Sequence, residues 1–156
     1  MNPDKWVDIA TVIADNYALF DGFVVLHGSD TMSYSASALS FMLENVAKPV
    51  IFTGSQLPIG DLRTDAKENL ITAIQIASLR NNNEPVVSEV CLYFEYKLYR
   101  GNRTTKINAE HFQAFTSPNY PELVESGVHL KLNSDLFLPL IKDKKLQVHK
   151  NLDTNV

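Results

Sequence analysis

Three apolar segments bounded by turn residues restrict the fold of this chain more than any other feature. Residues 23–26 and 50–53 are runs of four, the second ending at Thr53, and residues 89–94 form a longer run that begins with Glu89 and that residues 97–100 continue or pair with. Continuous apolar runs between turn signals are typical of strands buried on both faces. We therefore predict two strands that are buried on both faces, followed by a third strand.

Apolar residues at helical spacing lie before and between these strands. They predict helices over about residues 3–18, 32–45 and 66–77, and Asn2 and Pro3 supply an N-cap and a first helical residue. Strands that alternate with helices of this length predict an α/β fold of βαβ units, with helices packed on a parallel sheet.

The pattern after residue 100 is less regular. It predicts a short helix over residues 108–115, a strand over residues 128–132 and an edge strand over residues 146–148. Residues 143–145 are expected to form a solvated turn, and residues 151–156 are expected to form a linker.

Composition places the chain among ordinary folded domains and disfavours several functions. Its 156 residues suffice for one domain, and 45% are hydrophobic and 21% charged. A net charge of -4 provides no basic surface for nucleic acid, and no apolar run reaches the length of a membrane span. The single cysteine, Cys91, excludes an intrachain disulfide, and no His or Cys spacing matches a metal site.

Two loops that follow predicted strands contain residues suited to chemistry. Residues 27–31 read His-Gly-Ser-Asp-Thr, and residues 53–56 read Thr-Gly-Ser-Gln. In open parallel sheets ligands bind beyond the carboxyl ends of the strands, and each loop also opens a helix whose free N–H groups can hold an anion. Both loops are therefore candidates for a ligand site, although neither matches a P-loop or a dinucleotide-binding turn.

Simpler interpretations exist for individual residues. Residues 29–31 are all good helix N-caps, although three in a row exceed what one helix end needs and Gly28 allows close approach of a ligand. His27 is expected to bond to backbone, and Lys106 is expected to be solvated unless a carboxylate and a hydroxyl lie beside it. Charged residues in the first turn of the third helix are expected to serve solubility and the helix dipole: Arg63, Asp65, Lys67 and Glu68.

Longer segments give a more specific signal. Residues 24–32 contain His-Gly-Ser-Asp-Thr-Met, which resembles the second signature (His-Gly-Thr-Asp-Thr-Met) of the bacterial-type L-asparaginases. Further segments resemble the cytoplasmic type I branch of that family: residues 35–45, 48–51, 53–58 and 98–106. The resemblance runs in order from about Asn2 to at least Gly127, which makes it more specific than any single motif.

The resemblance implies a three-layer, Rossmann-like N-terminal domain of the asparaginase fold, with a mostly parallel sheet and helices on both faces. It implies hydrolysis of L-asparagine to L-aspartate and ammonia without a cofactor, in a cytoplasmic homodimer or homotetramer. By position, Ser29, Asp30 and Lys106 would be catalytic, with Asp30 also binding the substrate α-amino group. The implied substrate-binding residues are Gly28, Ser29, Asp30, Gly54 and Ser55, the last two beside the scissile amide.

Two departures from the family pattern affect these expectations. Ser29 replaces the usual threonine, which keeps the hydroxyl and frees its χ1 angle. The family's Thr-Gly-Gly-Thr-Ile segment, with its threonine nucleophile, does not occur in the sequence. We therefore expect residues 1–135 to form the main part of the N-terminal domain without its first segment, and residues 136–156 to be a tail or linker toward a C-terminal domain. The chain alone is expected not to hydrolyse asparagine.

Two other functions stay open at this point. One is a related amidase, such as the asparaginase-like subunit of a tRNA amidotransferase. The other is a non-catalytic fragment that binds an amino acid, since type I members can carry a regulatory asparagine site, which the segment around Thr105 and Lys106 would border.

Overall fold

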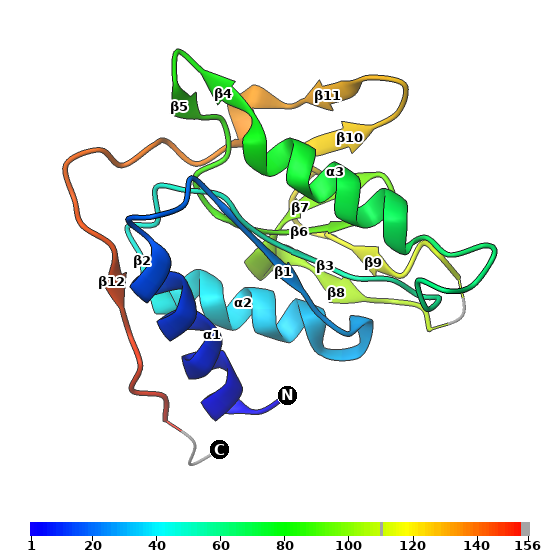
Figure 1. Cartoon of the computed structure of the whole chain (residues 1–156), viewed down its shortest axis with the longest axis horizontal. Helices are drawn as coiled ribbons and strands as arrows, with labels where there is room; N and C mark the ends of the chain where they lie inside the picture. The colour runs from blue at the N-terminus through cyan, green and yellow to red at the C-terminus, as the bar shows by residue number, and fades with distance from the viewer. Residues whose placement is uncertain (110, 154–156) are drawn as a thin grey trace.

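A six-stranded mixed sheet lies between two layers of helices in the computed structural model, which describes residues 1–109 and 111–153 (Figure 1). The sheet order is β1-β3-β6-β7-β10-β11. Its strands are β1 (Phe23–Leu26), β3 (Val50–Thr53), β6 (Val90–Phe94), β7 (Lys97–Arg100), β10 (Val124–Ser126) and β11 (Leu130–Leu132). Strands β1, β3 and β6 are parallel, and the remaining pairs are antiparallel. The predicted parallel core is thus confirmed, and hairpins extend it.

The helices cover both faces of this sheet, as predicted. Helices α1 (Pro3–Asn16) and α2 (Met32–Met42) lie on one face and α3 (Ala66–Ser78) on the other (Figure 1). Neighbouring residues of β3 point to opposite faces. Phe52 packs in the core formed with α1 and α2, whereas Ile51 packs in the core under α3. The alternation explains why β3 is buried on both faces and why its sequence is apolar throughout.

Short elements complete the described chain. The two-residue strands are β2 (Leu43–Glu44), β4 (Arg80–Asn81), β5 (Glu84–Pro85), β8 (Thr105–Lys106), β9 (Phe115–Thr116) and β12 (Gln147–Val148). The 3-10 turns are η1 (Ser29–Thr31), η2 (Gly101–Arg103) and η3 (Ser134–Leu136). Strand β8 pairs with β9, and this hairpin brings Lys106 beside the start of α2.

Strand β1 differs from its prediction. It was expected to be buried on both faces, but Leu26 is 65% exposed and its other residues are half-buried. The reason is its position: within the described residues β1 pairs with β3 alone and forms an edge of the sheet. An apolar run cannot by itself distinguish a central strand from an edge strand.

The region after β7 shows two further differences. The predicted helix over residues 108–115 is wrong for the described residues of that range, which exclude residue 110. There the chain folds back on itself: the Ile107 N–H donates to the Ala114 carbonyl at 2.8 Å, and Phe115 packs on Phe94 with ring centroids 5.0 Å apart. Strand β10 was not predicted, and β11 is shorter than the predicted strand.

The segment after residue 135 packs against the sheet in the part that the structure describes. The Leu138 N–H donates to Glu89 Oε1 at 2.9 Å, and Arg100 donates both to Glu89 Oε2 at 2.6 Å and to the Leu136 carbonyl at 2.8 Å. Strand β12 then pairs with β2, which confirms the predicted edge strand. The domain boundary after residue 135 stays a prediction, and residues 154–156 lie outside the described residues.

Candidate active site

The loop after β1 and the β8–β9 hairpin bring three predicted site residues together. Lys106 Nζ donates to Ser29 Oγ at 2.9 Å and to Asp30 Oδ1 at 2.7 Å. These contacts span more than 70 residues of sequence, which no local pattern could show. The Lys106 side chain is 15% exposed, whereas that of Asp30 is 91% exposed. Lys106 is therefore not the solvated lysine of the simpler interpretation, and Asp30 offers an open carboxylate.

The capping interpretation of this loop is wrong for its side chains. Thr31 occupies the N-cap position of α2, but its side chain makes no capping hydrogen bond. Ser29 and Asp30 instead form the turn η1, which precedes α2, and their side chains accept from Lys106. A Cβ at Gly28 would meet no atom within 4 Å, so packing does not require a glycine there.

His27 has the structural role that the sequence predicted. Its Nδ1 lies 2.7 Å from the Gly28 carbonyl oxygen, so Nδ1–H donates to that oxygen. Nε2 lies 2.9 Å from Ser35 Oγ, so it accepts from the Ser35 hydroxyl when the ring is neutral, and Ser35 Oγ accepts from Trp6 Nε1–H at 2.9 Å. The chain of hydrogen bonds ties the backbone at the start of the site loop to α1 and α2.

The second loop packs directly on the first. A Cβ at position 54 would lie 2.2 Å from the His27 carbonyl oxygen, so only glycine fits there. The Asp65 carboxylate accepts from the backbone N–H groups of Gln56 and Leu57 at 3.0 to 3.1 Å. Asp65 therefore fixes this loop, a function that its assignment to a solvated first turn missed. No hydrogen bond joins Ser55 to the Ser29–Lys106 group among the described residues.

Lys106 changes the acidity of Asp30. The hydrogen bond from Lys106, followed by its positive charge, lowers the pKa of the Asp30 carboxyl below its usual value. A carboxylate with a lowered pKa keeps its partner at neutral pH and loses it only as the pH falls through that lowered value. The pair is therefore formed at neutral pH.

We expect Lys106→Met to raise the pKa of Asp30 toward the ordinary aspartate value, because both lowering influences come from Lys106. Titration of the Asp30 carboxyl carbon by NMR measures this shift. The matched control is Lys97→Met, since Lys97 lies near Glu122 rather than Asp30. An unchanged Asp30 titration in Lys106→Met would show that the pair does not form in solution.

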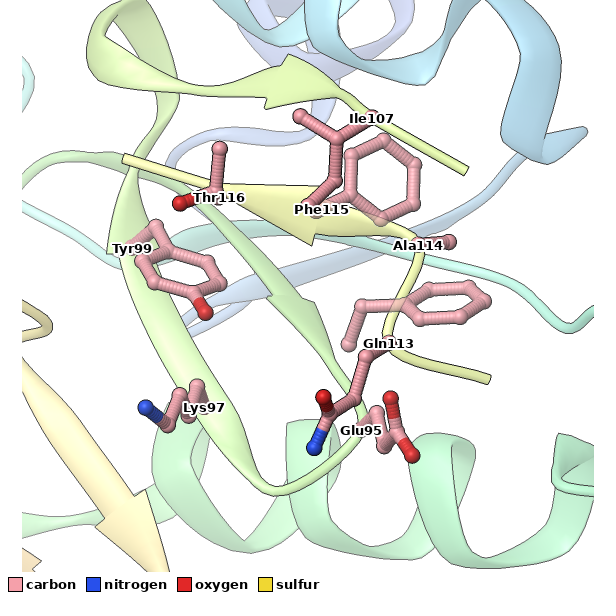
Figure 2. Close-up of a pocket in the computed structure, with 9 residues that line it drawn as sticks. Glu95, Lys97, Tyr99, Ile107, Gln113, Ala114, Phe115 and Thr116 are labelled. Atoms are coloured by element: carbon pink, nitrogen blue, oxygen red, sulfur yellow. The ribbon is translucent and has the colours of Figure 1, made fainter. Parts of the chain in front are cut away.

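Two cavities have Ile107 as a common lining residue. The first, of about 370 Å³, holds the candidate site and is lined by Asp30, Ser33, Tyr34, Thr105, Lys106, Ile107, Asn108 and Ala109. Figure 2 shows the second, of about 210 Å³, which lies against β7 and β9. Aromatic and aliphatic side chains line it together with Glu95, Lys97 and Gln113. It contains none of the residues predicted from the sequence to be catalytic, so the site is assigned to the first cavity.

Residues 1–109 and 111–153 show neither a metal-ligand cluster nor a membrane-spanning helix. These residues contain no group of three or more His, Cys, Asp or Glu side chains arranged to hold a metal ion. No helix in the same part of the chain is long and apolar enough to cross a membrane.

Comparison with known proteins identifies the family. The family model described as "Asparaginase, N-terminal" matches residues 1–137, which is most of the chain. The chain belongs to the asparaginase family. The resemblance to bacterial-type L-asparaginases, including the type I branch, is thus confirmed beyond single motifs.

Individual relatives of this asparaginase-family chain include bacterial and mammalian proteins. L-asparaginase 1 of Escherichia coli strain K12 is 54% identical over 131 residues, 84% of this chain and 37% of the relative. The 60 kDa lysophospholipase of Mus musculus is 46% identical over 156 residues, 100% of this chain and 27% of the relative. The crystal structure of L-asparaginase I from Vibrio cholerae O1 biovar eltor matches with a TM-score of 0.85 at 47% identity, covering 95% of this chain and 44% of that one. The chain thus spans less than half of each of these relatives.

Proposed function

We propose that this chain supplies Ser29, Asp30 and Lys106 to the active site of an L-asparagine amidohydrolase, which releases L-aspartate and ammonia. The observation that carries the proposal is the pair of hydrogen bonds from Lys106 Nζ to the Ser29 hydroxyl and the Asp30 carboxylate. The E. coli and V. cholerae relatives are both named L-asparaginases, which supports L-asparagine as the substrate.

The geometry suits Ser29 to proton transfer. Because Lys106 donates to Ser29 Oγ, the hydroxyl hydrogen of Ser29 is free to point toward a ligand or a water molecule. When that hydrogen is passed on, negative charge develops on Oγ, and the Lys106 ammonium lies 2.9 Å away to stabilise it. Ser29 would then assist the threonine nucleophile that the family signature implies.

Asp30 suits the recognition of an amino acid. An ionised carboxylate accepts about four hydrogen bonds. Lys106 donates to one acceptor position on Oδ1 of Asp30, and most of the Asp30 side chain faces solvent. Asp30 would therefore accept from the α-ammonium group of asparagine, while Gly54 and Ser55 lie beside the scissile amide. This division places the charged end of the substrate at Asp30 and its amide toward Ser29.

A substrate panel tests the proposal. Purified full-length gene product would be assayed with L-asparagine, L-glutamine and a lysophospholipid, the last because the mouse relative is named a lysophospholipase. We expect ammonia release from L-asparagine. Hydrolysis of the lysophospholipid without ammonia release from either amide would overturn the assignment.

We further propose that the protein works in the cytoplasm as a homodimer or homotetramer without a cofactor. The resemblance to the type I branch supports all three points. Light scattering of the purified gene product measures its mass in solution, and a monomer at assay concentration would contradict the proposed assembly.

A further inference from the structure

A fully buried asparagine lies behind the second site loop. Asn69 is on the second turn of α3 and has 0% exposure. Burying an amide is costly unless each of its polar atoms finds a partner. Both polar atoms of this side chain have partners, which lie in the Gly54 loop, at Asp65 and in the turn between β6 and β7.

The amide nitrogen of Asn69 holds the second loop in two ways. Nδ2 donates to the Gly54 carbonyl at 2.9 Å and to Asp65 Oδ2 at 3.0 Å. The same Asp65 carboxylate accepts from the N–H groups of Gln56 and Leu57. Asn69 and Asp65 therefore hold the loop on both sides of Ser55: Asn69 binds Gly54, and Asp65 binds the N–H groups that follow Ser55.

The contact with Gly54 sets the orientation of one peptide plane. In a trans peptide the C=O and the following N–H point in opposite directions. No cis peptide occurs in the described chain, so the Gly54 carbonyl points toward Asn69 and the Ser55 N–H points away from it. Gly54 is also in contact with the His27 carbonyl, which leaves the loop little room to move.

The amide oxygen of Asn69 holds a second element. The Glu95 N–H donates to Asn69 Oδ1 at 3.1 Å. Glu95 and Tyr96 form the β6–β7 turn with φ angles of 43° and 68°, a left-handed conformation that is costly for residues other than glycine or asparagine. One side chain thus links the Gly54 loop to a strained turn on the neighbouring strand pair.

We infer that Asn69 is a positioning residue for the proposed amidohydrolase, fixing the Gly54–Ser55 peptide beside the scissile amide. The inference rests on the proposed function for the identity of the reaction, but the fixing of the loop is a separate structural claim. Asp30, which would bind the α-ammonium group, shares no hydrogen bond with the Asn69 side chain among the described residues. Loss of Asn69 should therefore misplace the amide end of the substrate and spare recognition of its charged end.

The test compares Asn69→Ala with Ile76→Val in the full-length gene product. Ile76 is on the same helix and fully buried, so its truncation destabilises α3 without touching the loop. We expect Asn69→Ala to lower kcat for L-asparagine by about 10- to 100-fold, the usual effect of a misplaced group, with KM changed by less than about threefold. Ile76→Val should leave both near the parent values.

A second measurement separates the fixing of the loop by Asn69 from the role of that loop in the proposed reaction. Amide hydrogen exchange at Gln56 and Leu57 should become about tenfold faster in Asn69→Ala and stay unchanged in Ile76→Val. If Asn69→Ala does not fold, Asn69→Asp keeps the acceptor for Glu95 and removes the donor to Gly54, and it should show the same changes. Parent-like kcat and exchange in a folded Asn69 variant, or equal changes in Ile76→Val, would overturn the inference. Faster exchange in a protein whose parent lacks amidohydrolase activity would instead overturn the proposed function and support the fixing of the loop.

Discussion

Ser29→Ala is expected to lower kcat/KM for L-asparagine by about 10²- to 10⁴-fold, the range for loss of a group that transfers a proton. The Ser29 hydroxyl accepts the hydrogen bond from Lys106, and alanine removes that hydroxyl. Ser29→Thr keeps the hydroxyl and adds the methyl that the family signature usually has, so it should retain activity. Initial rates of ammonia release by the full-length gene product measure both.

The control for this pair is Ser78→Ala. Ser78 ends α3, is exposed and bonds only to the Gln75 carbonyl, so its loss should not change the rate. Turnover by Ser29→Ala at the rate of the parent would remove Ser29 from the mechanism. Loss of activity in Ser78→Ala would show that the assay reports folding rather than chemistry.

Arg100→Met is expected to destabilise the fold by about 3–5 kcal/mol, the usual effect of leaving one charge of a buried pair without its partner. Glu89 is 2% exposed, and its carboxylate accepts from Arg100 at 2.6 Å. Arg100 also stacks on the Tyr120 ring at 4.3 Å and donates to the Leu136 carbonyl. The variant therefore loses the contact that anchors the segment after β11 as well as the ion pair.

Lys97→Met is the matched control, because Lys97 lies on the same strand. Its ammonium group is 3.8 Å from Glu122, and the two side chains are 41% and 32% exposed, far more than the Arg100–Glu89 pair. Exposed pairs of this kind contribute about 0–1 kcal/mol. Urea unfolding of the two variants compares them directly, and a loss below about 1 kcal/mol in Arg100→Met would contradict the role given to the buried pair.

Local patterns in the sequence predict most of the helices and strands, but they do not predict which neighbours each element packs against. The apolar run at residues 50–53 and the helical spacing at residues 66–77 each lead to the correct element. Strand β1 has a similar apolar run and is nevertheless an edge strand, because its burial depends on neighbours that the run does not specify. The segment around Phe115 has a spacing compatible with a helix, but Phe115 packs on Phe94, 21 residues earlier in the sequence.

The candidate site was predictable only in part, for the same reason. Its hydroxyl and carboxylate are adjacent in sequence, so residues 27–31 attract attention at once. The partnership of Ser29 with Lys106 spans 77 residues and entered through resemblance to a family rather than through spacing. Asp65 and Asn69 were missed because a charged or polar residue in a first or second helical turn ordinarily faces solvent. The one local signal was the Gly54 loop before α3, whose N–H groups need acceptors.

The rate of ammonia release from L-asparagine by Lys106→Met, relative to the parent and to Lys97→Met, tests the central claim most directly. Lys106 is the residue that joins Ser29 to Asp30, and the NMR titration of Asp30 shows whether that pair has been broken in the variant. We predict a loss of about 10²- to 10⁴-fold in Lys106→Met and a parent-like rate in Lys97→Met. A folded Lys106→Met protein that releases ammonia as fast as the parent would contradict the assignment of the Ser29–Asp30–Lys106 group as catalytic.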